Sequence, residues 1–354
     1  MNVSIIVPVY QVAPYIEACL KSVMQQTYRG SMECLLIDDC GTDHSIAIAE
    51  RLTATYDGPV RFRVLHHERN RGLSASRNTG LAQAEGEFIF FLDSDDEISH
   101  ECIELLMRKV EEDDTVELVQ GLTRSYPIKN IDGLSTRISV TKASSNEDVR
   151  KCFFQSRQLV TSAWNKLIKR SFLENHDISF VEGLIFEDTP WLFDMLKHLT
   201  KVSFVKEITY HYKRRTGSIV TGSSNARKSE SFENIFRHIA NNLTLGYEQQ
   251  EVNYYGRKFS FFYARYSRFL PEMGDVYQLW KKKAKEYGSL YVRMRMATSK
   301  ALAKFKYGWI VLSVITRIEQ PSLIPSDVMR LYRATLEKGG TGTVSRIKGV
   351  SNNQ

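Results

Sequence analysis

Three carboxylates follow a strongly apolar run in this sequence. Residues 88–92 are five consecutive apolar residues, a pattern typical of a strand buried on both faces. Asp93, Asp95 and Asp96 come directly after them. Carboxylates this close repel one another unless a cation lies among them, and hard divalent ions prefer oxygen ligands. The stretch predicts a divalent metal site, because a cap for the helix after Ser99 would explain one carboxylate but not three.

Polar groups also follow other predicted elements. Asp38 and Asp39 end an apolar run, where they could accept hydrogen bonds from the imide N–H of a base and from ribose hydroxyls. An Asx turn, or a cap for the helix after Asp43, is the alternative. Arg77 could offer its planar fork to a phosphate or a carboxylate, unless it pairs with Glu85 in a surface loop.

Alternating strands and helices would position these groups. Four β-rich runs alternate with three segments of helical periodicity along the first quarter of the chain. This pattern predicts an α/β fold of parallel βαβ units with right-handed crossovers, in which ligands bind beyond the carboxyl ends of the strands. The β-rich runs are 3–9, 35–37, 60–65 and 88–92, and the helical segments are 16–24, 48–56 and 73–84.

After Ser99 the pattern is less regular, and after Arg227 nearly every segment has helical character. We therefore expect a catalytic domain over 1–225, a basic helical region over 226–340 and a frayed tail over 341–354. Within the expected catalytic domain, a Ser/Thr-rich stretch covers 127–145. The helices expected after Ser99 are 103–110, 148–155 and 189–199, and the short strands are 118–119, 202–205 and 208–212.

Composition excludes several classes of protein. The chain has 354 residues and is 42% hydrophobic, enough for a sizeable core. Five cysteines without a CxxC pair argue against a disulfide framework and a zinc ribbon, and for a reducing compartment. No apolar run reaches the length of a membrane-spanning helix. The N-terminal residues are expected to form a first strand and not a signal peptide.

The net charge of +7 is unevenly distributed. From Asn225 onward, 22 Lys and Arg stand against 10 Asp and Glu, a balance of +12, which leaves −5 for the preceding residues. The basic region could approach anionic lipid head groups or a pyrophosphate-linked acceptor, with 307–315 as its most membrane-leaning part. An ordinary helical domain with solvated lysines is the alternative. No recognition motif supports nucleic acid as a partner.

Five short motifs together resemble family 2 inverting glycosyltransferases of the GT-A fold. The resemblance covers roughly the first two-thirds of the chain. The family usually has Ala where Ser76 stands, which is a conservative change. In chain order the motifs are Val7-Pro8-Val9-Tyr10, Asp38-Asp39-Cys40-Gly41-Thr42-Asp43, Asn70-Arg71-Gly72 with Arg77-Asn78, Asp93-Ser94-Asp95-Asp96 and Glu187-Asp188.

The resemblance implies a Rossmann-like, mostly parallel sheet flanked by helices, with a helical C-terminal extension. It also implies a UDP-sugar donor bound with Mn²⁺ or Mg²⁺. Asp188 would be the general base that deprotonates an acceptor hydroxyl, with Glu187 beside it; a helix cap is the alternative for this pair. Asp95, Asp93 and His211 would bind the metal, unless His211 is structural. The expected nucleotide-sugar contacts are Pro8, Tyr10, Asp38, Asp39, Asn70, Arg77, Asp93, Arg214 and Ser218, and Trp164 is expected on the acceptor face or in the core.

The family context points to synthesis of bacterial surface polysaccharide, on a glycan or lipid-linked acceptor, at the cytoplasmic side of a membrane. A nucleotidyltransferase is disfavoured because Pro8-Val9-Tyr10-Gln11 stands where a Gly-rich phosphate loop would lie, and a dehydrogenase because that turn lacks GxGxxG. A non-catalytic sugar-binding or scaffolding protein remains as an alternative. The joint presence of Asp93, Asp95 and Asp188 argues against it.

Overall fold

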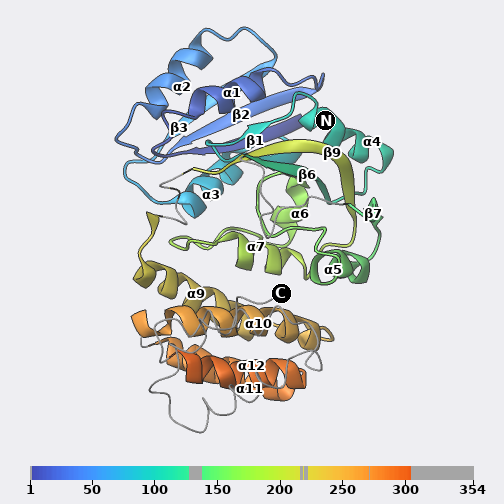
Figure 1. Cartoon of the computed structure of the whole chain (residues 1–354). Helices are drawn as coiled ribbons and strands as arrows, with labels where there is room; N and C mark the ends of the chain where they lie inside the picture. The colour runs from blue at the N-terminus through green and yellow to red at the C-terminus, as the bar shows by residue number, and fades with distance from the viewer. Residues whose placement is uncertain (1, 127–137, 216–217, 219–221, 271, 304–354) are drawn as a thin grey trace, which may run out of the picture. The chain divides into compact units, whose positions relative to one another are not determined.

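The computed structural model describes residues 2–126, 138–215, 218, 222–270 and 272–303. The chain forms two compact units, Met1–Arg227 and Lys228–Gln354, so the division lies close to the boundary expected after residue 225 (Figure 1). The segments 127–137 and 307–315 and the tail 341–354 lie outside the described residues. Within the described part of the chain, no helix has both the length and the apolar character needed to cross a bilayer.

A nine-stranded sheet forms the centre of the N-terminal unit. Its strand order is β3-β2-β1-β4-β8-β6-β9-β5, and β7 pairs with β9 beside this path. The longest ladders are parallel, which agrees with the predicted fold class. The strands are β1 (Asn2–Val9), β2 (Ser31–Asp38), β3 (Val60–His66), β4 (Phe88–Phe91), β5 (Glu97–Ile98), β6 (Leu118–Tyr126), β7 (Lys142–Ala143), β8 (Lys166–Lys169) and β9 (Val202–Lys213).

The predicted parallel arrangement is confirmed for β1 to β4. Strand β1 pairs in parallel with β2 and β4, and β2 pairs in parallel with β3. All four residues of β4 are buried, as their unbroken apolar run requires. The register places Val9 opposite Asp38 and Asp38 opposite His66, so the loops after β1, β2 and β3 lie at one edge of the sheet. The polar motifs of the sequence follow these same strand ends.

The far half of the sheet differs from the sequence-based expectation. Strand β8 was not expected, and it pairs antiparallel with both β4 and β6. The two short strands expected at 202–205 and 208–212 form the single strand β9, because the exposed Lys206 and Glu207 interrupt the apolar pattern without ending the strand. Irregular register between β6 and β9, at Gln120 to Thr123, accommodates this interruption.

Helices cover both faces of the sheet. Apolar residues of α1 and α4 share one buried cluster with alternate residues of β1, whereas α3 contacts β1 and β2 from the opposite face. Gly80 permits this approach, since a Cβ there would lie 2.3 Å from Ile6 Cγ2. The helix expected at 189–199 ends earlier, at Met195. The helices are α1 (Ile16–Met24), α2 (Ser45–Ala54), α3 (Leu73–Gln83), α4 (Cys102–Glu112), α5 (Asn146–Phe154), α6 (Arg170–Asn175) and α7 (Asp188–Met195).

The described part of the C-terminal unit is helical and has an aromatic core. Trp280 is fully buried, stacks on Phe259 with ring centroids 5.8 Å apart and donates its indole N–H to Phe236 O at 2.9 Å. The aromatic residues that lie between basic residues in the sequence therefore pack inward. The elements are α9 (Asn225–Asn241), α10 (Glu248–Tyr266), the 3₁₀ helix η1 (Ser267–Phe269), α11 (Met273–Glu286) and α12 (Leu290–Leu302).

Candidate active site

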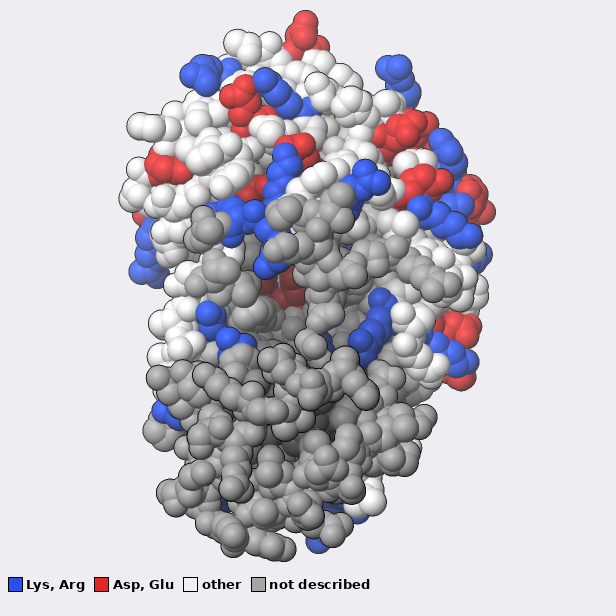
Figure 2. Space-filling model, viewed as in Figure 1, with Lys and Arg blue, Asp and Glu red and all other residues white. Residues whose placement is uncertain are grey.

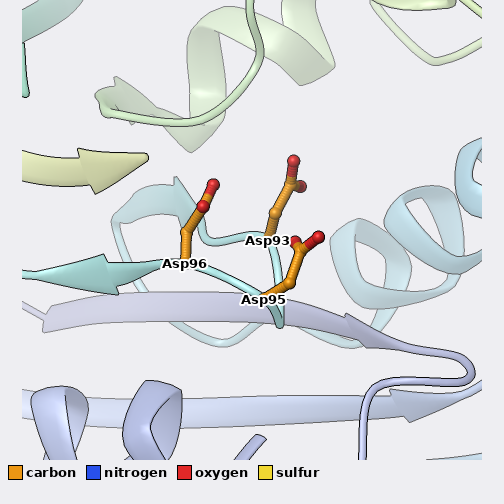
Figure 3. A group of neighbouring side chains, drawn as sticks. All are labelled: Asp93, Asp95 and Asp96. Atoms are coloured by element: carbon orange, nitrogen blue, oxygen red, sulfur yellow. The ribbon is translucent and has the colours of Figure 1, made fainter. Parts of the chain in front are cut away.

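Three carboxylates lie together on the loop after β4. Asp93, Asp95 and Asp96 each offer an oxygen within 4.8 Å of the others, and Figure 3 shows their side chains pointing to the same side of the loop. The loop is closed by the Asp96 N–H, which donates to Asp93 O at 3.0 Å. Buried strand β4 thus ends in a concentrated negative charge, as the sequence predicts.

Asp96 joins this loop to β9. Tyr210 donates its hydroxyl to Asp96 Oδ2 at 2.8 Å, and the Lys213 N–H donates to Asp96 Oδ1 at 2.6 Å. Asp96 is 1% exposed, and burial together with the charges of Asp95 and Asp93 raises its pKa well above the usual value. Because Asp96 is buried and joins the loop to β9, we assign it a structural role, and the more accessible Asp93 and Asp95 are the better candidates for metal ligands.

Asp93 and Asp95 keep the capacity to bind a cation. Asp93 accepts from Arg77 Nη2 at 2.8 Å, and Asp95 accepts from Arg215 Nε. A carboxylate has about four lone-pair positions, so these bonds do not exhaust either group. Burial and the charge of Asp93 raise the pKa of Asp95, although Arg215 acts in the opposite direction. Since a divalent cation would relieve this repulsion, the residues fit Mn²⁺ or Mg²⁺.

Arg77 connects the aspartate loop to a second group of carboxylates. Its Nη2 donates to Asp93, while Nη1 donates to Glu187 Oε1 at 2.6 Å and to Asp188 Oδ1 at 3.1 Å. The side chain is 1% exposed and lies over Phe180, with 5.2 Å from Cζ to the ring centroid. Burial would lower its pKa, but the three carboxylates outweigh burial and raise it. Arg77 therefore remains charged and binds carboxylates, whereas Glu85 pairs with Arg61 and Arg63.

Glu187 and Asp188 lie where α7 begins, and their side chains face Arg77. Glu187 is the N-cap residue but its side chain makes no cap hydrogen bond, so capping does not account for its position, whereas Asp188 lies in the first turn, where the helix dipole favours an acid. Phe186 precedes it with a φ of 65°, a conformation that bulky residues rarely adopt. Burial and the charge of Glu187 raise the pKa of Asp188 to about 7, against the opposing influence of Arg77. A carboxylate with that pKa is suited to general-base chemistry near neutral pH.

Lys166 is a buried cation that sequence reasoning did not assign to the site. It is 0% exposed and donates its ammonium to Ser162 O. Burial lowers its pKa to about 7, and its charge in turn lowers the pKa of Asp188. The sequence carried no signal for this burial, because Lys166 begins a strand of four residues that contains two lysines.

The Asp38-Asp39 pair divides into two roles. Asp39 is 2% exposed and its carboxylate accepts hydrogen bonds from the backbone N–H groups of Arg71 and Gly72, both at 2.8 Å. It also accepts from the Asn70 amide at 2.9 Å and contacts His67 Nδ1 at 2.8 Å. Asp39 thus organises the loop before α3. At the start of α2 the N-cap residue is His44, and the carboxylate that reaches the helix is that of Asp43, which accepts from the Ser45 N–H at 3.1 Å, and not one of this pair.

Asp38 is more accessible than Asp39. Its Oδ1 accepts from the Cys40 N–H at 3.1 Å and its Oδ2 contacts His66 Nδ1 at 3.0 Å, with 17% of the side chain exposed. Tyr10, at the end of β1, is 45% exposed, whereas Pro8 is buried within the strand. At this sheet edge Tyr10 and Asn70 are exposed and Asp38 is partly accessible, so these three members of the expected nucleotide set are within reach of solvent.

The structure does not bring His211 into the aspartate group. Side chains alternate along β9, and Tyr210 and Tyr212 both stack on Trp164, so His211 projects from the other face. Its ring lies 5.8 Å from that of Tyr126, and its Nδ1 is buried and has no hydrogen-bond partner among the described residues. Burial lowers its pKa. The metal site proposed below consequently uses Asp93 and Asp95 alone.

Three other expected contacts have different environments. Trp164 is 7% exposed, and its ring centroid lies 4.5 Å from that of Tyr210, which corresponds to the core alternative. Arg214 is exposed and its N–H donates to Tyr126 O at 2.9 Å. Ser218 is half-buried and accepts from the Gly222 N–H at 2.8 Å. The arginine that reaches the aspartates is Arg215, which the basic run alone could not distinguish from Arg214.

Charges of both signs are mixed on the surface of the N-terminal unit. Among its described residues, Lys and Arg side chains alternate with Asp and Glu on the face drawn in Figure 2. Four of the five carboxylates of the site are instead contacted by two guanidinium groups, those of Arg77 and Arg215, whereas Asp96 accepts from the Tyr210 hydroxyl and the Lys213 N–H. Counted over the described residues, negative charge therefore exceeds positive charge within the site, which favours a bound cation.

Comparisons with known proteins show a family similarity over the N-terminal part of the chain. Residues 4–177 match the model of the family Glycosyl transferase family 2. EpsH of Bacillus subtilis, named as a glycosyltransferase, is 36% identical over 222 residues, which are 62% of this chain and 62% of EpsH. The poly(ribitol-phosphate) beta-N-acetylglucosaminyltransferase TarS of Staphylococcus aureus is 30% identical over 245 residues, 68% of this chain and 40% of TarS. The chain thus spans about three-fifths or less of these two relatives.

Two solved structures share the fold. TarS 1-349 in complex with UDP-GlcNAc superposes with a TM-score of 0.71 at 22% identity, covering 90% of this chain and 93% of that chain. The mannosyltransferase PcManGT from Pyrobaculum calidifontis, in complex with GDP-Man and Mn²⁺, gives a TM-score of 0.54 at 16% identity and covers 95% and 86%. At these identities the two superpositions show the fold alone.

Proposed function

This chain belongs to glycosyl transferase family 2 through its N-terminal domain, and on that premise we propose that it transfers a sugar from a UDP-sugar to an acceptor hydroxyl. The acceptor would be a glycan or a lipid-linked glycan in the synthesis of a bacterial surface polysaccharide. The named activity of TarS and its complex with UDP-GlcNAc support this donor class. The proposal concerns the whole protein, of which the family match covers residues 4–177.

One observation supports the proposal above the others. Arg77 contacts Asp93 with one nitrogen and both Glu187 and Asp188 with the other. Residues separated by more than ninety positions in the sequence therefore meet at one guanidinium group. A donor diphosphate at Asp93 and an acceptor hydroxyl at Asp188 would consequently be close enough to react.

Asp93 and Asp95 would hold the divalent cation. When bound, Mn²⁺ or Mg²⁺ supplies a Lewis acid that neutralises charge developing on the UDP leaving group. Mn²⁺ is bound in PcManGT, which shares the fold. Arg215 would compensate charge at Asp95, and Asp96 would keep the loop attached to β9.

Asp188 would act as the general base. Its carboxylate would accept the proton of the acceptor hydroxyl as that oxygen attacks the anomeric carbon from the side opposite UDP, and the sugar would be transferred with inversion. Glu187, which is 5% exposed, would hold Arg77 in place and raise the basicity of its neighbour. No covalent enzyme intermediate is required, because a single displacement inverts the centre.

The uracil and ribose would lie at the edge formed by the loops after β1 and β2. Asp38 would accept the imide N–H, because Asp39 is occupied by the loop of Asn70 to Gly72. Tyr10 would cover the base, and Asn70 would act through its hydrogen bond with Asp39. Arg214 and Ser218 would approach the diphosphate from the chain after β9.

We expect the pH profile of transfer to follow Asp188. Because the base must be unprotonated, kcat/KM for the acceptor should rise with pH through an apparent pKa near 7. Glu187→Gln removes a charge that raises the pKa of Asp188 and should shift this limb to lower pH. Lys166→Met removes an opposing charge and should shift it to higher pH. Profiles that do not move, or move together, would contradict the assignment.

A donor screen tests the function itself. Purified full-length protein is incubated with individual UDP-sugars, Mn²⁺ and an acceptor such as poly(ribitol-phosphate), and UDP release is measured with and without EDTA. Acceptor-dependent UDP release from at least one donor, lost with EDTA, is the expected result. If no combination of donor, metal and acceptor releases UDP, the non-catalytic sugar-binding or scaffolding alternative is favoured.

We also propose peripheral contact with an anionic membrane on the cytoplasmic side. Three exposed lysines of α11, Lys281, Lys282 and Lys285, contribute to the excess positive charge of the C-terminal region. The full chain should sediment with phosphatidylglycerol vesicles but not with phosphatidylcholine vesicles, and salt should release it. Changing the three lysines to glutamate should weaken binding at least tenfold. Equal binding to both vesicles would contradict the proposal.

A further inference from the structure

The proposed general base Asp188 and its neighbour Glu187 lie at the end of a segment that has little regular structure of its own. Residues 178–188, termed the base segment, run from the end of α6 to the first residue of α7. Two of its residues have positive φ angles, Gly183 at 83° and Phe186 at 65°. A segment of this kind depends on contacts with its surroundings to place a catalytic side chain accurately.

Asn78 makes the most specific of these contacts. Its side-chain amide donates to Phe180 O at 2.9 Å and accepts from the Phe180 N–H at 2.9 Å. The amide therefore pairs with both polar backbone groups of one residue, as a neighbouring strand would. Only a side chain that donates and accepts at once can do this, which an aspartate or an apolar residue cannot.

Phe180, the residue held by these two hydrogen bonds, packs against both α7 and Arg77. Phe180 is 2% exposed and stacks on Trp191 of α7, with ring centroids 4.8 Å apart and an interplanar angle of 11°. The Arg77 guanidinium lies over the same Phe180 ring. Arg77 and Asn78 are consecutive in α3, so the helix contacts the base segment at its start through Asn78 and at its end through Arg77.

We propose that Asn78 is a positioning residue that fixes the base segment, and with it Asp188, relative to the aspartate loop. This assignment rests on the proposed transferase function, but it concerns a residue that need not touch donor or acceptor. Loss of the Asn78 amide should leave the nucleotide site intact but displace Asp188. A shift of about 1 Å in a reacting group can reduce a rate by about 10²-fold.

The test compares Asn78→Ala and the isosteric Asn78→Asp with a matched control. Asn146→Ala removes an amide that also makes two hydrogen bonds to backbone, to Leu196 O at 2.9 Å and Leu199 O at 2.8 Å, near the other end of α7. All variants are made in the full-length chain. The measurements are hydrogen exchange of residues 178–188, calorimetric binding of UDP with Mn²⁺, and kcat with the donor that the wild type uses.

We expect faster exchange in residues 178–188, UDP affinity within about twofold of wild type, and kcat lowered about 10–100-fold for both Asn78 variants. Asn146→Ala should leave exchange in that segment and kcat unchanged. Unaltered exchange in both Asn78 variants, or an equal loss of UDP affinity and kcat, would overturn the proposal. If the wild type turned over no donor, the transferase function would fail, whereas the exchange data would still decide whether Asn78 fixes the segment.

Discussion

Replacement of Arg77 by leucine should destabilise the N-terminal unit by about 3–5 kcal/mol, because three carboxylates would lose the buried cation that they share. For a unit of this size that corresponds to a fall in Tm of roughly 6–20 °C, measured by calorimetry. Turnover should be lost as well, since Asp93 and Asp188 would repel each other without the intervening guanidinium. Arg77→Lys retains the positive charge, but its single ammonium nitrogen cannot replace the two guanidinium nitrogens that contact Asp93 on one side and Glu187 and Asp188 on the other. We therefore expect this variant to retain more of the wild-type stability than of the wild-type turnover.

Arg108→Leu is the control for this experiment. Arg108 forms an ion pair with Glu104 at 3.3 Å on the surface of α4, with 57% and 40% of the two side chains exposed. Loss of such a pair should change stability by less than about 1 kcal/mol. A Tm for Arg77→Leu as close to wild type as that of Arg108→Leu would contradict the bridging role of Arg77.

Asp188→Asn should reduce kcat by about 10²–10⁴-fold while binding of UDP with Mn²⁺ stays near the wild-type level. The amide oxygen can still accept from Arg77, so the geometry around the guanidinium should persist. The amide cannot, however, take a proton from an acceptor hydroxyl. Single-turnover UDP release and calorimetric UDP binding, measured on the same preparation, separate the two effects.

Asp194→Asn provides the matched change on the same helix. Asp194 of α7 pairs with Lys197 at 2.6 Å and has no assigned role in the reaction. Its variant should retain kcat. If Asp188→Asn also turned over at the wild-type rate, the base would have to be a different group, and the inverting mechanism proposed for Asp188 would be wrong.

The first half of the sheet could be predicted because its signals are local. Residues 88–91 are apolar without interruption, and the strands before them alternate with amphipathic helices. The antiparallel half could not be predicted in the same way. Strand β8 has only four residues, two of them lysines, and its position between β4 and β6 depends on contacts far away in the sequence.

The acidic residues of the candidate site could be predicted from the sequence more fully than its basic residues. The spacing of Asp93 and Asp95 indicates a candidate cation site without knowledge of the fold, since repulsion between neighbouring carboxylates requires compensation. The sequence cannot show that Arg77 would contact acids more than ninety positions away, nor that Lys166 would be buried near them. Whether His211 or Tyr210 faces the aspartates depends on the register of β9, because a shift of one residue in that register moves each side chain to the other face of the sheet.

The position of β9 has a consequence for the growing chain on the ribosome. This strand is the last of the sheet to be synthesised, yet it lies between β6 and β5. Until Lys213 has emerged, the edge of β6 lacks its partner and the loop of Asp96 lacks its anchors. Between the synthesis of β6 and that of β9 the nascent N-terminal unit therefore presents an open strand edge, which makes that interval its period of greatest risk of misassociation.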